Sequence, residues 1–158
     1  MSFLAKIDST GYEVLTALVI ANVTAQIIKT IVFAMQHKKA DLRMLFTTGG
    51  MPSSHSSSVV AMATTIGFLH GFESTIFALA TTFAIVVMYD SAGVRRAAGK
   101  QAAVLNSILA ELVSDTHHLS GAKLKELLGH SPKQVIVGGF LGFLVSYLLR
   151  EAILSGVV

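Results

Sequence analysis

Two histidines in this sequence stand at the start of long apolar segments, where they could take part in phosphoryl transfer. The first, His55, ends the tetrapeptide Pro52-Ser53-Ser54-His55. Backbone N–H groups in the first turn of a helix lack intrahelical partners and carry the positive end of the macrodipole, so this turn could hold a phosphate. Either serine could cap the helix, and the imidazole could pass a proton to or from the bound group. The alternative is an ordinary serine cap with a surface histidine beside it.

The second histidine, His130, stands just before Pro132, a residue that suits the first turn of a helix. One imidazole could attack phosphorus while the other protonates the departing oxygen, and basic side chains would neutralise the phosphate. The basic candidates are Lys29, Arg95 and Arg96. A basic pair can also serve only as a membrane anchor, but that role leaves the neighbouring Asp90 and Gly93 unexplained.

Lys29 lies inside an apolar segment, where a charge is costly unless it reaches the interface or meets a partner. Asn22 and Gln26 precede it at helical spacing, so all three residues share one helix face. A lysine that only snorkels to the membrane surface needs no such polar stripe beneath it. We therefore expect Lys29 to face the site.

The composition places these residues in a small integral membrane protein. Hydrophobic residues make up 53% of the chain and charged residues 13%, whereas soluble domains carry about 25% charge. We expect one all-α domain over residues 1–158, a membrane helical bundle. Without cysteine there is no disulfide or thiolate chemistry. Nucleic acid is excluded as a partner because no basic stripe with interleaved aromatic residues is present.

Four apolar segments predict membrane spans at about 12–35, 56–70, 74–90 and 134–154. The second is short and could be tilted or re-entrant, but a plausible hairpin turn at residues 70–73 favours four crossings. The connection 91–133 should hold short helices at Gly99–Val113 and Ala122–Leu128, lying on the membrane surface or over the ends of the spans. Residues 115–118 between them contain Asp115, His117 and His118, and we interpret them as a solvated turn rather than a metal site.

The basic residues predict the orientation. Nine of the twelve lysines and arginines lie in the first and third connections, which share one side of a four-span bundle. The positive-inside rule makes that side, and the site with it, cytoplasmic. The net charge of +3 also fits attraction to anionic lipid headgroups.

Three stretches together resemble the divergent membrane branch of the type 2 phosphatidic acid phosphatase superfamily, which is related to bacterial acid phosphatases and vanadium-dependent haloperoxidases. They are Gly-Gly-Met-Pro-Ser-Ser-His-Ser at 49–56, Tyr-Asp-Ser-Ala-Gly-Val-Arg-Arg at 89–96 and Leu-Lys-Glu-Leu-Leu-Gly-His at 124–130. The resemblance implies that His55 is the general acid and that His130 is the nucleophile of a phosphohistidine. It implies phosphate contacts from Ser53, Lys29 and either Arg95 or Arg96, without a metal or other cofactor.

The sequence also departs from the superfamily pattern. Ser54, a further candidate for phosphate binding, replaces the usual glycine of its block. Gln134 occupies the position of the aspartate that orients the nucleophilic histidine. An amide can accept the ring N–H but supplies no negative charge, and a comparable change in a serine protease lowers turnover about ten-thousandfold. Asp90 or Asp115 could take over this orienting role.

Three hypotheses follow. The chain is a phosphatase acting on a lipid phosphate or pyrophosphate, or a non-catalytic binder of phosphate or phospholipid, or a structural membrane protein whose polar positions only pack helices. The expected partners are such a phosphate ligand and the membrane lipids. Gly138, Gly139 and Gly142 could pair helices within one chain or in a homo-oligomer.

Overall fold

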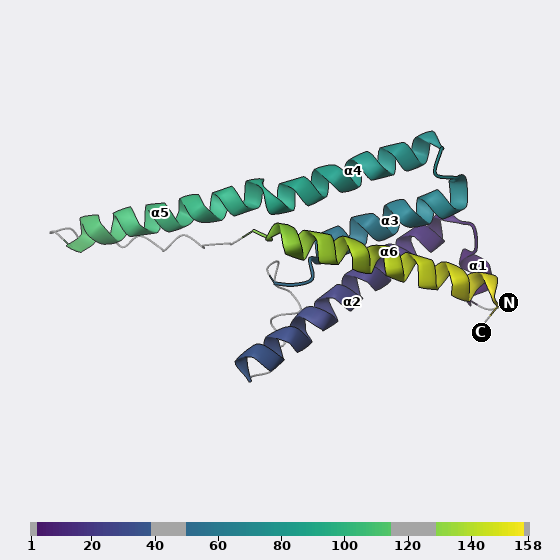
Figure 1. Cartoon of the computed structure of the whole chain (residues 1–158), viewed down its shortest axis with the longest axis horizontal. Coiled ribbons are helices and arrows are strands. Elements are labelled where there is room, and N and C mark those ends of the chain that lie inside the picture. The colour runs from purple at the N-terminus through teal and green to yellow at the C-terminus, as the bar shows by residue number, and fades with distance from the viewer. Residues whose placement is uncertain (1–2, 39–49, 115–128, 157–158) are drawn as a thin grey trace.

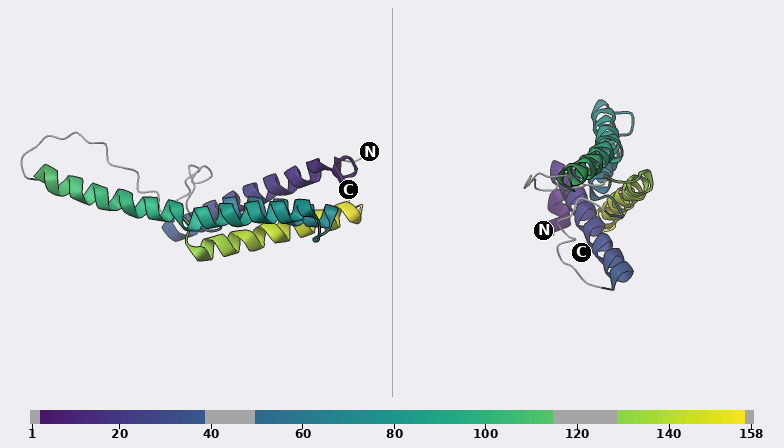
Figure 2. Two further views of the ribbon diagram at one scale, coloured as in Figure 1. Left: turned by 90° about the horizontal axis from the view of Figure 1, so that it is seen from above. Right: turned by 90° about the vertical axis from the view of Figure 1, so that its left-hand side faces the viewer.

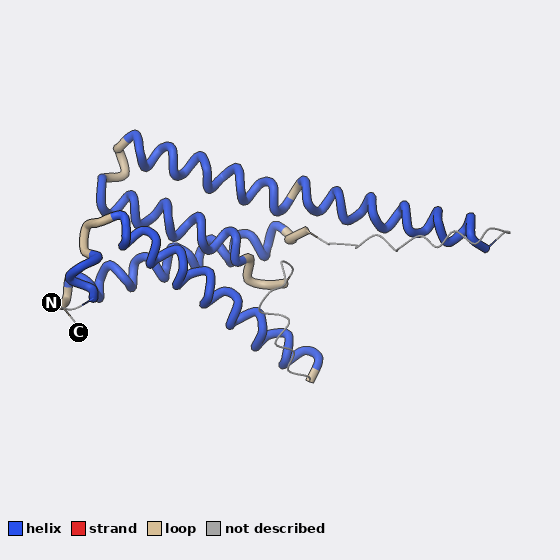
Figure 3. The backbone as a smooth tube through the Cα atoms, turned by 180° about the vertical axis from the view of Figure 1, so that it is seen from behind, coloured by secondary structure: helices blue, strands red, loops and turns tan. Residues whose placement is uncertain are grey.

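A computed structural model describes residues 3–38, 50–114 and 129–156 of the chain (Figure 1). These residues form helices and their connecting turns, without a strand (Figure 3), so the all-α prediction is confirmed. The helices are α1 (Phe3–Ile7), α2 (Gly11–His37), α3 (Ser54–His70), α4 (Thr75–Ala92), α5 (Val94–Ser114) and α6 (Pro132–Leu154).

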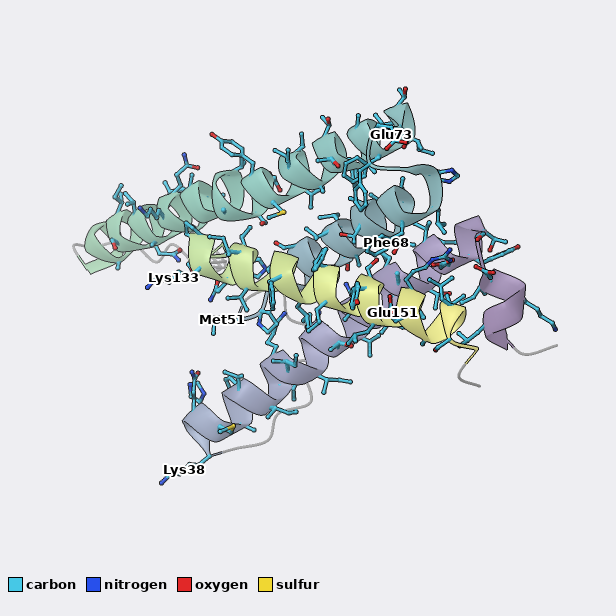
Figure 4. All side chains as sticks on the ribbon, turned by 45° about the vertical axis from the view of Figure 1, so that its right-hand side comes forward. Lys38, Met51, Phe68, Glu73, Lys133 and Glu151 are labelled. Atoms are coloured by element: carbon cyan, nitrogen blue, oxygen red, sulfur yellow. The ribbon has the colours of Figure 1, made fainter. Side chains whose placement is uncertain are left out.

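The bundle is built around α3, which packs against α2, α4 and α6. The four helices of the bundle, α2, α3, α4 and α6, alternate in direction, so both chain ends lie at one end of the bundle while α3 and α6 begin at the other (Figures 1 and 2). We call this second end the His130 end. Figure 4 places Met51 and Lys133 there, and Glu73 and Glu151 at the opposite end. The first and third connections therefore leave from the same end, as the sequence predicts.

Among the described residues, three segments are long and apolar enough to cross a membrane: α2, residues 75–110 through α4 and much of α5, and α6. The central helix α3 has 17 residues and buries ten of them, whereas α2 buries five of 27. Neighbouring helices thus cover much of α3, which explains how it carries several buried serines and threonines. That residues 56–70 themselves cross the bilayer stays a prediction.

The helix expected at Gly99–Val113 is present, but it begins five residues earlier, at Val94, and has 21 residues. It follows α4 after a break at Gly93 and continues away from the bundle in nearly the same direction (Figures 1 and 2). The two helices keep nearly the same direction because backbone hydrogen bonds continue through the break. Gly93 N–H donates to the Tyr89 carbonyl, and Ala97 N–H donates to the Gly93 carbonyl. The helix predicted at 122–128 and the turn at 115–118 lie outside the described residues.

Helix α6 approaches α3 to backbone contact. A Cβ atom placed on Gly138 would lie 2.4 Å from the Ser53 carbonyl oxygen, and one on Gly142 would lie 2.2 Å from the Ser57 carbonyl oxygen. Small residues at this spacing let membrane helices pack closely. These two glycines therefore pair helices within the chain.

Helix α2 meets α3 along small residues at every fourth position. Ala17, Ala21 and Ala25 are fully buried, and the same series begins with Glu13 and ends with Lys29. Residues four apart lie on one helix face. The packing of the alanines therefore turns both charged side chains into the bundle.

An ion cluster joins the chain termini at the end opposite His130. Arg150 of α6 lies 3.0 Å from the Glu13 carboxylate and 2.9 Å from that of Asp8. Glu13 is fully buried and also accepts the Ser9 backbone N–H. This cluster fastens the turn between α1 and α2 to α6.

The glycine contacts predict a position-specific effect on stability. Gly142→Ala should lower the free energy of unfolding by about 1–3 kcal/mol, because the new methyl group meets backbone that cannot move aside cheaply. Gly139→Ala is the matched control, since a Cβ there would lie 3.5 Å from Val60 and 3.6 Å from Met88, which is ordinary contact. Thermal unfolding in detergent measures both. Equal effects of the two substitutions would contradict this packing.

Candidate functional site

The two histidines meet at the His130 end of the bundle. Their ring centroids lie 6.1 Å apart, with the ring planes tilted by 56°. His130 is only 3% exposed, and its backbone N–H donates to the Ser91 carbonyl at 3.1 Å. The end of α4 therefore holds the segment that leads into α6. His55 and His130, which are 75 positions apart in sequence, are neighbours in space.

A second backbone hydrogen bond joins the starts of α3 and α6. Ser53 N–H donates to the Gln134 carbonyl at 3.1 Å, next to the close contact of Gly138 with Ser53. The first turns of the two helices are thus held at one level. His55 lies in the first turn of α3, and His130 lies two residues before α6. The link between the two first turns therefore sets the separation of the two histidines.

The serines before His55 shape its turn. Ser53 is the N-cap of α3, as predicted: its hydroxyl accepts the Ser56 backbone N–H at 3.3 Å and the Ser56 hydroxyl at 3.0 Å. The Ser54 hydroxyl accepts the Gln26 side-chain amide at 3.4 Å. Both serines are almost fully buried. Their direct contact with a phosphate stays a prediction.

Lys29 lies inside the bundle, with 2% of its surface exposed. Its stem packs against Gly50, where a Cβ would lie 3.1 Å from Lys29 Cγ. Gly50 has a φ of +95°, a conformation that favours glycine. The chain leading into α3 therefore closes over the lysine stem, and the side chain is not extended toward the surface.

The polar stripe before Lys29 pairs with the serine face of α3. Asn22 donates to the Ser58 hydroxyl at 3.0 Å, and Gln26 donates to Ser54. These bonds satisfy polar groups that would be costly in hydrocarbon. They also fix the rotation of α2 against α3, and with it the direction of Lys29.

Gln134 closes the first turn of α6. Its side-chain oxygen accepts the Ser131 backbone N–H at 2.8 Å, while the Ser131 hydroxyl accepts the Gln134 backbone N–H at 3.4 Å. This is a reciprocal capping box, for which either Gln or Glu is suitable. The pattern Ser131-x-x-Gln134 is a sequence signature of such a box, and it was not among the features predicted from the sequence. The orienting role of Gln134 toward His130 stays a prediction.

The remaining candidates come from the junction of α4 and α5. Asp90 is partly exposed in the last turn of α4, beside the buried Ser91 that holds His130. Arg95 and Arg96 lie in the first turn of α5, just beyond Gly93. The backbone therefore brings this basic pair to the same end of the bundle as both histidines. Sequence patterns did not indicate the roles of Ser91 and Gly50, because each acts through its backbone on a residue distant in sequence.

Comparison with known proteins identifies the family. A family model described as the divergent PAP2 family matches residues 11–145, which include both histidines and Lys29. This chain belongs to that family. It is also 39% identical over 150 residues to a Bacillus subtilis (strain 168) protein named "Uncharacterized membrane protein YuiD", covering 89% of this chain and 94% of that protein. No solved structure matches significantly.

The divergent PAP2 family assignment confirms the resemblance noted from the three sequence stretches, and the chain is an integral membrane protein. The matched region runs from α2 into α6. All the candidate residues that the structure describes thus fall within the family region.

The capping box predicts how Gln134 variants behave. Gln134→Ala should lower the free energy of unfolding by about 1 kcal/mol, because Ser131 N–H loses its acceptor. Gln134→Glu should retain stability within about 0.5 kcal/mol, since its carboxylate accepts the same bond and suits the positive end of the helix dipole. Thermal unfolding in detergent compares them. A loss with Gln134→Glu as large as with Gln134→Ala would contradict the box.

Proposed function

We propose that this protein is a membrane phosphatase that hydrolyses a lipid phosphate or pyrophosphate through a phosphohistidine on His130. The observation that carries the proposal is the pair of imidazoles 6.1 Å apart, of which His130 is buried and held by the Ser91 carbonyl. At this separation, one phosphoryl group can contact both rings. Membership of the divergent PAP2 family supports the reaction type.

The reaction needs two steps. An imidazole nitrogen of His130 attacks phosphorus, the bond from phosphorus to the lipid oxygen breaks, and His55 donates a proton to that oxygen. Water, deprotonated by His55, then attacks the phosphohistidine, so inorganic phosphate leaves and both histidines return to their starting states. With a pyrophosphate substrate, the first leaving group is the lipid monophosphate.

The charge on the transferred group is neutralised by the protein. Lys29 and the basic pair at Arg95 and Arg96 supply positive charge, and the first turn of α3 supplies backbone N–H groups. The buried position of Lys29 supports this role, because a cation away from bulk water acts more strongly on a nearby anion. No metal or other cofactor enters the scheme.

A second candidate function is binding of phosphate or phospholipid without catalysis. The observation that favours it is Gln134, an amide engaged in the capping box where the superfamily pattern has the orienting aspartate. A binder would be stabilised thermally by inorganic phosphate or phosphatidate, in the parent and in His130→Ala alike, and Arg95→Ala would lose the effect. A purely structural protein would tolerate alanine at both histidines, Lys29 and both arginines, and would show no ligand effect.

The catalytic proposal predicts which histidine substitutions matter. His130→Ala should lower phosphate release from a panel of lipid phosphates by more than about a thousandfold, because no nucleophile remains. Lys29→Met should lower it about a hundredfold. His70→Ala is the matched control, since His70 ends the same helix that His55 opens and is exposed at the opposite end. Parent-like release from His130→Ala would rule out this mechanism.

We further propose that the His130 end faces the cytoplasm, on the basis of its basic connections. The chain has no native cysteine, so single cysteines report orientation directly. Lys38→Cys, at the exposed end of α2, should react with a membrane-impermeant maleimide only after cells are permeabilised. Ser155→Cys, exposed just beyond α6 at the other end, should react in intact cells. The reverse pattern would place the site outside the cytoplasm.

A further inference from the structure

An apolar groove of about 330 Å³ runs along the lipid-facing side of α3, between α4 and α6. Its walls include Val60 of α3, Thr81 and Met88 of α4, and Phe143 of α6, and it ends at Phe72 and Phe77. Polar side chains contribute only the hydroxyls of two threonines. We propose that this groove binds the hydrocarbon chain of the lipid phosphate, an inference that rests on the proposed function of the site.

One end of the groove adjoins the candidate site. Met88 lies one turn before Ser91, whose carbonyl accepts the His130 N–H. Across the groove, Gly139 of α6 faces the same position: a Cβ there would contact Val60 and Met88 at 3.5 and 3.6 Å. A chain lying in the groove would therefore end, at this side, beside the segment that carries His130.

The other end is closed by two aromatic rings. Phe72 and Phe77 pack edge to face, with centroids 5.1 Å apart. Gly67 makes room for them, because a Cβ at that position would lie 2.5 Å from Phe72 Cε1. The groove thus has a floor on α3 and a wall at the end remote from the histidines.

The dimensions fit one hydrocarbon chain. From Phe77 to Met88 the groove follows eleven helical residues, about 16 Å of rise. This length is about half of a bilayer core of roughly 30 Å, the depth of one leaflet. The volume over this length corresponds to a mean cross-section of about 20 Å². A transmembrane helix, about 10 Å across, is far too wide to enter.

The setting determines the chemistry of the occupant. Both walls belong to segments long and apolar enough to span the membrane, so the medium outside the groove is hydrocarbon. A lipid phosphate fits this setting, because its headgroup would lie at the histidines and its hydrocarbon chain would lie in the apolar groove.

The test is photolabelling of the full-length protein in phosphatidylcholine vesicles that contain a phosphatidate with a mid-chain diazirine. We expect adducts concentrated at residues 77–88 of α4 and around Phe143, reduced at least fivefold by unlabelled phosphatidate and not by additional phosphatidylcholine. Uniform labelling of all lipid-facing surfaces, or equal competition by phosphatidylcholine, would overturn the proposal, because the groove would then hold only bulk lipid.

Adjacent threonines provide the matched variants. Thr81→Phe fills the groove and should reduce specific labelling at least fivefold, whereas Thr82→Phe, exposed on the neighbouring face of α4, should not. Thr81→Leu fills it less and serves if Thr81→Phe fails to fold, as judged by thermal unfolding. Equal labelling of the Thr81 and Thr82 variants would also overturn the proposal.

Phosphate release measured in the same vesicles distinguishes a failure of the groove proposal from a failure of the proposed function. Specific labelling with no phosphate release would leave the groove in place and rule out the phosphatase. Phosphate release that requires His130, combined with uniform labelling, would support the phosphatase and rule out the groove. In an active protein, Thr81→Phe should raise KM for long-chain substrates about tenfold, whereas Thr82→Phe should leave that KM unchanged.

Discussion

The close approach of α3 to α6 is the contact on which the site depends. Gly138 and Gly142 bring α6 against the backbone of Ser53 and Ser57, a distance that no larger residue allows. At that distance Ser53 N–H can reach the Gln134 carbonyl, which sets the two helices in register at their first turns. The register places His55 and His130 beside each other. The geometry of the two imidazoles is thus a consequence of glycine packing about two to three helical turns beyond His130.

A related constraint governs the polar residues inside the bundle. Buried hydroxyls and amides are costly in hydrocarbon unless they are bonded, and α3 supplies partners between Ser54 and Thr65. Ser54 and Ser58 accept from α2, Ser57 donates to the Ala21 carbonyl, and Thr65 pairs with Ser146 of α6 at 2.6 Å. These bonds need a narrow helix with short side chains at the centre. The composition of α3, poor in large apolar residues, therefore follows from its central position, and so does the inward direction of Lys29.

Local patterns predicted the helices well, because apolar segments, the Ser53 cap and Pro132 are signals within a few residues of each other. They also predicted the inward face of Lys29, since Asn22 and Gln26 lie on the same stripe. Contacts between distant residues left no comparable signal. The ion cluster of Glu13 with Arg150 joins positions 137 residues apart, and Ser91 acts on His130 through a carbonyl that any residue would supply. Gly93 illustrates a further limit: a glycine marks a break, but the hydrogen bonds across it decide that α5 continues the line of α4.

The proposed site and the proposed groove together would limit the chemistry of a substrate more narrowly than either would alone. A phosphate at the histidines lies at the end of the bundle, whereas the groove begins one helical turn deeper and extends about one leaflet into the membrane. A ligand that fills both must carry its phosphate at one end of a long apolar chain. Soluble phosphate esters would use only the histidine end and would gain none of the free energy of burying apolar surface. If the basic connections face the cytoplasm, the hydrocarbon chain of the lipid enters the groove from the inner leaflet. The substrate would then be a lipid phosphate accessible from inside the cell.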